Sequence, residues 1–451
     1  MSGPVEFNQP GILARIDEAP LYDEAGKILK SVGMILEAHL PGARIGSICR
    51  IDADGRSSSA RPSVRAEVVG FREKRALLMA FDEAMGVHSD SLVRLEQEVS
   101  QVRVGDGLLG RVLDARGEPI DGKGPIAGLD EMIPRSLYQK PAHPIEREVI
   151  RKPLDLGVRA INALLTAGRG QRVGIMAGSG VGKSVLLGMM ARHTAADVNV
   201  IALIGERGRE VREFIERDLG PEGLARSVVI VATSDQSPLL RMRGAFLATT
   251  IAEHFRDRRR DVLLLMDSVT RFCMAQREIG LSMGEPPASK GYTPSVFSTL
   301  PKLLERAGTG PAGGSITGLY TVLVEGDDMD DPVADLSRSI LDGHIVLSRK
   351  IAQRNHFPAI DVLASASRVM GSVISEEHKD WSARVKEWMA LYRQVEDLLN
   401  LGAYQRGANP KIDTAIAVHD RIDALLRQKI EERGDLDATL AQLRSIIRSA
   451  E

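Results

Sequence analysis

The stretch that decides the fold is Ala177-Gly178-Ser179-Gly180-Val181-Gly182-Lys183-Ser184. Residues 172–176 before it have the pattern of a buried strand, and residues 185–190 after it have that of a helix. Glycines let backbone N–H groups turn inward around an anion at a helix N-terminus. Lys183 adds a positive charge beside the outer phosphates, and Ser184 offers a hydroxyl to Mg²⁺. The pattern predicts a phosphate-binding loop whose nucleotide contacts come from Gly178, Ser179, Gly180, Val181, Gly182, Lys183 and Ser184.

The loop departs from the usual pattern at one position. Ala177 stands where a first glycine is common, and that position needs only a small residue. A dinucleotide-binding fold is the alternative, but the glycine spacing departs from G-x-G-x-x-G. That fold would also leave the pair Lys183-Ser184 unexplained.

Around the loop, apolar strand segments alternate with helical periods from about Gly170 to Ser367. This alternation predicts an α/β domain with a parallel sheet covered on both faces, whose ligand lies at the carboxyl ends of the strands. The expected strands are residues 172–176, 198–204, 227–232, 262–267, 320–324 and 345–348.

Two further regions flank this domain. From about Gly33 to Glu98, short apolar stretches separated by turn residues predict a small β-barrel, and residues 110–126 predict a hairpin and loop. After Val373, apolar residues at helical spacing predict a helical tail, whose stripes form its core or dock a partner. The predicted domains are residues 1–96, a barrel with a partner-binding N-terminus; 97–375, the domain of the phosphate-binding loop; and 376–451, the helical domain.

The composition narrows the function classes. The 451 residues carry 59 Lys plus Arg against 61 Asp plus Glu, without the basic excess of a dedicated nucleic-acid binder. Aromatic residues make up only 4%, so stacking platforms for single strands are scarce. Cys49 and Cys273 cannot build a disulfide framework, and we expect both to be buried in a reducing compartment. Neither a signal peptide nor an apolar run of about 20 residues is found, which predicts a cytoplasmic protein.

Carboxylates follow two of the expected strands. Asp267 ends an apolar strand, where a nucleotide-bound Mg²⁺ needs a partner opposite Ser184. Alone, Asp267 would more simply begin a turn or cap a helix. Glu206 follows the strand 198–204 directly and can orient the attacking water. Glu210 competes for this role, but its position fits the first turn of the next helix, so we prefer Glu206.

Arg368 lies just beyond another strand, far from the loop in sequence. By itself it would be taken as a surface charge. Phosphoryl transfer, however, gains about 10³ to 10⁵ in rate from an arginine placed on the developing charge. The wider motif context must therefore decide its role.

Taken in order, these motifs resemble the catalytic subunits of the F-type and V-type rotary ATPases, and most of all the flagellar export ATPases and their injectisome relatives. The stretches 205–220 and 339–368 are similar to the flagellar group in particular. The resemblance covers nearly the whole chain and rests on residues 110–126, 157–166, 177–184, 205–211, 267–272, 284–308 and 358–368.

The resemblance implies roles for individual residues. Glu206 would be the catalytic carboxylate, with Arg207 supporting it; Arg271 would lie near the γ-phosphate, and Arg368 would be the arginine finger given to a neighbouring subunit. Phe357 would stack on adenine and Tyr404 would complete that pocket, although both could equally be ordinary packing residues. Residues 326–331 would form an acidic loop that faces a central stalk.

This chain carries both the glutamate and the finger arginine, which the two-subunit rotary enzymes divide between different chains. The resemblance therefore implies a homohexamer with ATP at each interface. We expect an ATP- and Mg²⁺-dependent hydrolase of the flagellar export apparatus, peripheral to the membrane export gate. Its partners would be the central stalk and chaperone-bound substrates on the helical tail, with no specific nucleic acid. Ile12, Leu13 and Ile16 would form one face of a short helix that binds a regulator, with a disordered terminus as the alternative.

Three alternatives to this reading stay open. The first is an injectisome ATPase, and the second is a hexameric nucleic-acid translocase of the transcription-termination kind. The third is a structural subunit that binds nucleotide without hydrolysing it, against which Glu206 argues.

Overall fold

The computed structural model describes residues 25–52, 63–324 and 330–450. The chain forms two compact units, which meet in sequence between Val99 and Ser100. The expected regulator-binding residues Ile12, Leu13 and Ile16, and residues 326–329 of the acidic loop, lie outside the described residues.

The first unit is a closed β-barrel with strand order β1-β2-β5-β4-β3-β6, closed by the antiparallel pairing of β1 with β6. Apolar side chains alternate along these strands and fill the interior, among them Leu36, Ile51, Leu78 and the buried Cys49. The predicted barrel is confirmed, but it begins ahead of Gly33. The strands are β1 (Ala25–Val32), β2 (Ile35–His39), β3 (Ile48–Asp52), β4 (Ser63–Arg72), β5 (Arg75–Ala80) and β6 (Leu92–Gln97).

The second unit is built on a nine-stranded sheet of the described residues, in the order β19-β18-β12-β17-β15-β13-β14-β8, with β16 paired to β17. Neighbouring strands are parallel except at β19 and β16, so the predicted parallel sheet is confirmed in its centre. The strands are β8 (Arg111–Asp114), β12 (Arg172–Ala177), β13 (Val198–Ile204), β14 (Ser227–Ala232), β15 (Asp261–Asp267), β16 (Gly308–Thr309), β17 (Ser315–Leu323), β18 (Gly343–Leu347) and β19 (Ile360–Ser367).

The predicted hairpin and loop at residues 110–126 are present, since Leu113 pairs antiparallel with Pro119 and the N–H of Asp114 donates to the carbonyl of Glu118. The prediction missed that β8, the first arm of this hairpin, is also an edge strand of the sheet, parallel to β14. The charged residues of β8 obscure its strand pattern in the sequence. Arg111 is buried, and its guanidinium donates to both carboxylate oxygens of Asp121 at 2.7 and 3.0 Å. The ion pair neutralises the charge that made a strand improbable.

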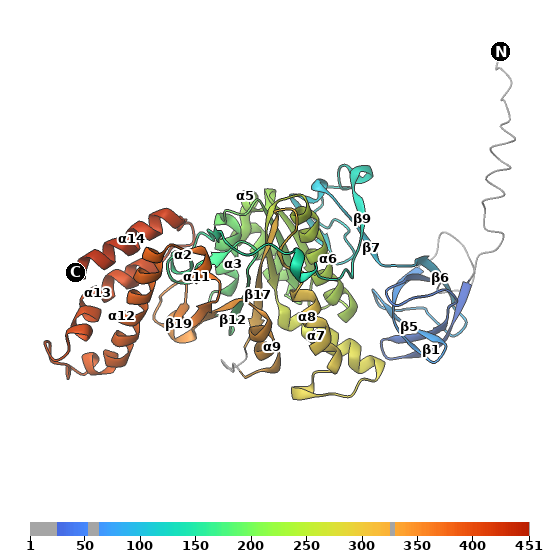
Figure 1. The fold of residues 1–451 in the computed structure, drawn as a ribbon. Coiled ribbons are helices and arrows are strands. Elements are labelled where there is room, and N and C mark those ends of the chain that lie inside the picture. Colours follow the sequence, from blue (N-terminus) through green and yellow to red (C-terminus); the bar gives the residue numbers. More distant parts are fainter. Residues whose placement is uncertain (1–24, 53–62, 325–329, 451) are drawn as a thin grey trace, which may run out of the picture. The chain divides into compact units, whose positions relative to one another are not determined.

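Helices cover both faces of the sheet. Figure 1 shows α3 (Lys183–His193) and α5 (Gly220–Ala225) on one side, and α6 (Pro238–Asp257), α7 (Val269–Met283) and α8 (Pro294–Leu304) on the other. Cys273 is buried in α7, as expected.

The remaining elements of this unit, apart from the tail, are short. They are β7 (Gln101–Val104) paired with β9 (Ile133–Ser136), β10 (Pro153–Leu154) paired with β11 (Ala167–Gly168), α2 (Arg159–Leu164), α4 (Gly208–Glu213), a π-helical turn (Phe214–Leu219), α9 (Pro332–Ile340), α10 (Arg349–Gln353), α11 (Met370–Val373) and 3₁₀ turns at 106–108, 129–131, 144–146 and 289–291.

The chain ends in three helices, α12 (Glu376–Asn400), α13 (Pro410–Leu426) and α14 (Leu436–Ser449), which confirms the helical tail. Val385, Trp388 and Leu443 bury their side chains in the same apolar core as β12 and α3. The stripes of the tail therefore pack within this unit. Among the described residues, no helix combines the length and the apolar character needed to cross a membrane.

Candidate active site

The phosphate-binding loop joins the end of β12 to the start of α3. Gly180 and Gly182 adopt left-handed φ angles of +77° and +84°, which side chains rarely tolerate. Gly182 precedes α3, and within the described residues no side chain caps this helix end. The first N–H groups of α3 are therefore open to an anion, favoured further by the helix dipole.

A cleft of about 560 Å³ opens over this loop at the carboxyl ends of the strands. Its position is the one that the parallel sheet predicts. The apolar side chain of Val181 is buried rather than exposed to the cleft. The cleft is lined by Gly178, Ser179, Gly180, Gly182, Lys183, Ser184, Val185, Gly205, Glu206, Arg207, Glu210, Ser234, Arg271 and Leu323.

Lys183 lies between two carboxylates. Its Nζ donates to Asp267 Oδ1 at 2.6 Å and to Glu206 Oε1 at 3.4 Å. Burial alone would lower the pKa of Lys183, but the negative charges of Asp267 and Glu206 outweigh it and raise the pKa. Lys183 is therefore a cation wherever the protein is folded near neutral pH.

Glu206 is mostly buried beside these charges. Burial and the charge of Asp267 raise its pKa to about 7, although Lys183 acts in the opposite direction. A carboxyl group that titrates near the working pH suits proton transfer. Glu210 lies on α4, where it accepts from Arg207 at 3.3 Å, and its side-chain hydrogen bond to Glu206 adds to the raised pKa of Glu206. The carboxylate that Lys183 contacts is that of Glu206.

Two side chains near the phosphate loop offer oxygen atoms to a cation. Ser184, in the first turn of α3, lines the cleft, and Asp267, at the end of β15, is buried beside Lys183. Asp267 is also fixed by Thr321, whose hydroxyl donates to it at 2.7 Å. Mg²⁺ is commonly held by one or two such protein oxygens together with nucleotide phosphates, so the donor set fits. Among the described residues, no cluster of three or more His, Cys, Asp or Glu could hold a metal unaided.

Arg271 borders the cleft from α7. Gly205, with φ +71°, packs against it so closely that an added Cβ would lie 2.7 Å from Arg271 Cβ. Arg271 Nε is buried and has no hydrogen-bond partner in the part of the chain that the structure describes. Arg207 is 77% exposed at the rim. The cleft thus carries two arginines beside Lys183.

A second, apolar cleft of about 470 Å³ continues from the first, because both are lined by Gly182 and Val185. Phe357 forms one wall, and an added Cβ on Gly182 would lie 3.6 Å from its ring. The other lining residues are Leu186, Met189, Pro358, Gln428, Lys429, Ile430 and Glu431. Its place beside the phosphate cleft and its apolar walls suit a nucleotide base.

Tyr404 is not among the residues that line this cleft. It lies between α12 and α13, where its hydroxyl donates to Asp413 at 3.1 Å. Residues 428–431, which sequence reasoning missed, line the apolar cleft instead. They carry no local motif, so nothing in the sequence signalled them. Thr321 was missed as well, and a polar residue inside an apolar strand was the available signal.

Arg368 lies at the opposite edge of the sheet. Ser367 pairs with Gly343 at the start of β18, whereas Leu347 at the end of β18 pairs with Ala177 beside the phosphate loop. Four residues of strand amount to roughly 13 Å. Arg368 is exposed, its guanidinium donates to the carbonyl of Arg338, and it does not line the phosphate cleft of its own chain.

Comparison with known proteins places this site in a family. Residues 157–367 match the ATP synthase alpha/beta family, nucleotide-binding domain, and residues 374–445 match the T3SS EscN ATPase C-terminal domain. The chain is 51% identical to the flagellum-specific ATP synthase of Bacillus subtilis, covering 96% of this chain and 97% of that protein. For the flagellum-specific ATP synthase of Salmonella typhimurium, the identity is 50% and the coverage 95% of each.

Injectisome proteins are similar as well. A type 3 secretion system ATPase of Sinorhizobium fredii is 48% identical over 92% of this chain and 90% of its own. The assembled ATPase EscN of enteropathogenic E. coli is 46% identical with a TM-score of 0.87, over 94% of this chain and 100% of that one. EscN solved with its central stalk EscO is 45% identical with a TM-score of 0.85 and the same coverage.

A phosphate loop at the carboxyl edge of a parallel sheet, with the Glu206 carboxylate beside its lysine, defines the protein as an ATP-hydrolysing P-loop enzyme of the ATP synthase alpha/beta class. Within that class, the chain belongs to the family of flagellum-specific and type III secretion ATPases. The resemblance and the activity predicted from the sequence are confirmed.

Proposed function

We propose that this chain hydrolyses Mg-ATP at interfaces between copies of itself, in a homohexamer that serves a flagellar export apparatus. One observation carries the proposal: Lys183 and Glu206 lie at the carboxyl edge of the sheet, whereas Arg368 lies exposed at the amino edge. An arginine in that position can reach only the nucleotide of another copy.

The chemistry follows from the charges in the cleft. An incoming triphosphate competes with Glu206 and Asp267 for Lys183, and drawing Lys183 away frees the Glu206 carboxylate to orient water. Water attacks the γ-phosphorus in line, ADP leaves, and Glu206 accepts the proton that the water loses. Arg271 lies on the same side as the phosphates, and a neighbour's Arg368 would stabilise the charge that develops there.

Ser184 and Asp267 are the residues that would hold Mg²⁺ with the nucleotide. When bound, the ion would supply positive charge that offsets the negative charge of the triphosphate. Phe357 would form the platform for adenine, since it walls the apolar cleft that continues from the phosphate loop.

The division into a barrel domain over 1–96, an ATPase domain over 97–375 and a helical domain over 376–451 is also proposed. Two observations support it: the compact units meet after Val99, and the tail helices begin at Glu376. On this division, the helical domain would contact chaperone-bound substrates and a regulator would bind the N-terminus. The solved complex of EscN with its stalk EscO supports a central-stalk partner. The enzyme would work at the cytoplasmic face of the inner membrane, beside the export gate.

Mixing two inactive variants tests the shared site. Glu206→Gln and Arg368→Ala are purified separately, combined, and assayed for ATP hydrolysis with the mass of the assembly measured in parallel. If the site is shared, mixed assemblies contain some interfaces with an intact Glu206 and an intact Arg368, and activity returns on mixing. Activity that stays absent in mixed assemblies of confirmed composition would overturn the shared site. A Glu206→Gln and Arg368→Ala double variant mixed with itself is the matched control.

Service in an injectisome is the second candidate, because the type 3 secretion ATPase of Sinorhizobium fredii is 48% identical. Deletion of the gene in the source organism separates the two. Loss of flagellar filaments with intact effector secretion supports the flagellar assignment, and the reverse supports the injectisome.

A further inference from the structure

The segment that carries Phe357 is attached to the helical tail at three consecutive residues. Arg427, the residue directly after α13, donates through Nη1 to the backbone carbonyl of Asn355 at 2.9 Å. His356 Nδ1 lies 2.8 Å from Asp423 Oδ1. The backbone N–H of Gln428 donates to the carbonyl of Phe357 at 3.0 Å. Each attachment leads to the end of one helix, α13.

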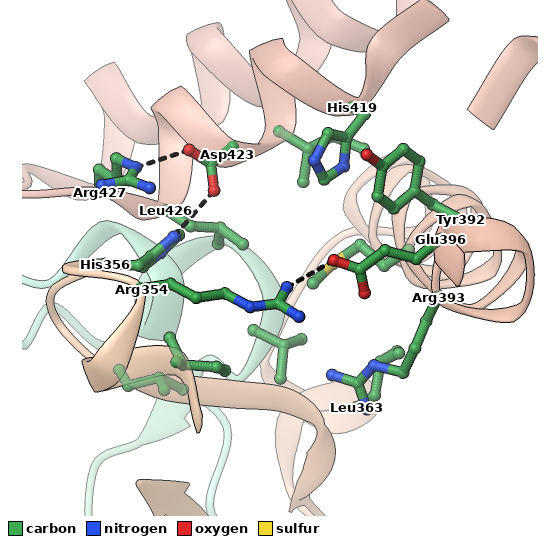
Figure 2. A pocket seen from close by; sticks show the side chains of 15 residues that line it. Arg354, His356, Leu363, Tyr392, Arg393, Glu396, His419, Asp423, Leu426 and Arg427 are labelled. Carbon is green, nitrogen blue, oxygen red and sulfur yellow. Dashed lines mark hydrogen bonds and ion pairs between the residues drawn. The ribbon is translucent and has the colours of Figure 1, made fainter. Parts of the chain in front are cut away.

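We call these contacts between residues 355–357 and the end of α13 the joint. Asp423 lies at its centre. One of its carboxylate oxygens pairs with His356, and the other accepts from Arg427 Nε at 2.6 Å. Figure 2 shows Asp423 between His356 and Arg427, which approach it from two sides. Asp423 therefore holds His356 directly and holds Asn355 through Arg427.

The joint has little apolar support on one side. A cavity of about 170 Å³ lies beside it between the tail helices and β19, walled by Met389, Tyr392, Ile422 and other residues (Figure 2). Packing does not fill this space, so polar contacts have a larger share in fixing the position of residues 355–357.

Gln428 cannot replace Asp423 in this role, because its side chain is fully engaged elsewhere. Its Oε1 accepts from the N–H of Arg159 at 2.8 Å, and its Nε2 donates to the carbonyls of Gly157 and Glu432 at 2.8 and 2.7 Å. These bonds fix the far wall of the apolar cleft. Phe357, which lines the same cleft, is held at its carbonyl by the Gln428 N–H, while the two residues before it are held by Asp423 and Arg427.

We propose that Asp423 is a positioning residue for nucleotide binding, which acts through His356 and Arg427 to hold the Phe357 ring against the base. The proposal rests on the proposed role of Phe357 as the adenine platform. The hydrogen-bond partners of Asp423, His356 and Arg427, do not line the phosphate cleft. The effect of Asp423 is therefore confined to the base half of the nucleotide.

The test compares a ligand that has a base with one that lacks it. Asp423→Ala is expected to raise the KM for ATP about 5- to 10-fold, the loss of roughly one charged hydrogen bond. The kcat should be nearly unchanged, since Lys183 and Glu206 are untouched. The inhibition constant of inorganic tripolyphosphate, which occupies only the phosphate cleft, should also be unchanged. Asp423→Asn, which keeps an acceptor oxygen, should recover part of the affinity.

The matched control is Asp420→Ala, an exposed carboxylate on the same helix outside the joint, which should leave both constants unchanged. A variant that merely loosens the fold would weaken ATP and tripolyphosphate alike, and that result would overturn the proposal. An unchanged KM for ATP would overturn it too.

A double-mutant cycle separates this proposal from the role of Phe357. If Phe357→Ala alone leaves the KM for ATP unchanged, the platform itself is wrong. If Phe357→Ala raises the KM, adding Asp423→Ala should raise it little further, because both act on one contact. Fully multiplicative effects would show that Asp423 does not act through Phe357.

Discussion

The two edges of the central sheet handle charge in opposite ways. At the carboxyl edge, Lys183 Nζ lies 2.6 Å from Asp267 Oδ1 and 3.4 Å from Glu206 Oε1, and all three side chains are largely buried. At the amino edge, Arg368 is exposed, and its guanidinium donates to the backbone carbonyl of Arg338 at 3.3 Å. Buried charges need partners in their own chain, whereas an exposed arginine is free to serve another chain. The difference indicates that one chain carries two half-sites.

The largest expected effect comes from the amino edge. Arg368→Ala should lower kcat by about 10³- to 10⁵-fold, because the developing charge on the phosphoryl group loses its arginine. Steady-state hydrolysis measures this, with ATP affinity determined separately. Arg338→Ala, on the neighbouring helix α9, is the control and should retain most of the activity. A kcat for Arg368→Ala within tenfold of the wild type would remove the functional difference between the edges.

Glu206→Gln tests the carboxyl edge. The amide cannot accept a proton from water, so kcat should fall about 10²- to 10⁴-fold, while ATP still binds. Single-turnover hydrolysis separates this step from product release. Glu210→Gln should be far milder, because Glu210 pairs with Arg207 rather than with Lys183. A larger loss in Glu210→Gln than in Glu206→Gln would reverse the assignment.

Phe357→Ala tests whether the carboxyl edge extends into the apolar cleft. Loss of ring stacking should raise the KM for ATP about 10-fold, since such contacts are worth about 1 to 3 kcal/mol. The kcat should change little. Tyr404→Ala is the paired comparison, and we expect no change in KM because Tyr404 does not line the cleft. An equal rise in both variants would place Tyr404 at the base after all.

The last expected effect is on stability without nucleotide rather than on activity. Because the folded state raises the pKa of Glu206 to about 7, its ionised form is disfavoured in the fold. The wild type therefore loses stability as the pH rises through 7, and Glu206→Gln avoids that loss. At pH 8, the free energy of unfolding of Glu206→Gln should exceed that of the wild type by about 2 to 3 kcal/mol, which raises its melting temperature by a few degrees.

The pH dependence checks the cause. Toward about pH 3.5, below both pKa values, the wild-type carboxyl group is protonated in the folded and unfolded states, so the difference should vanish. Glu213→Gln, an exposed glutamate on α4, should show no such dependence. A gain that is equal at pH 5 and pH 8 would mean that charge is not the reason.

Much of the fold followed from local pattern. The strands 198–204 and 227–232 were predicted with their observed bounds, because continuous apolar runs bounded by turns have few other solutions. The edge strand β8 was missed, since its polarity is compensated only by Asp121, which lies beyond the strand. Short edge strands carry a weak periodic signal.

The sequence by itself determined the phosphate loop, the strand-end acids and the family, because these depend on residue types at short spacing. Tertiary structure alone decided which groups meet. It brought residues 428–431 to Phe357, from which they are far separated in the sequence, and it left Tyr404 outside the apolar cleft. It also set Arg368 on the edge opposite Lys183. The physical reason is that strand direction and helix packing, not spacing along the chain, fix the distance between side chains far apart in sequence.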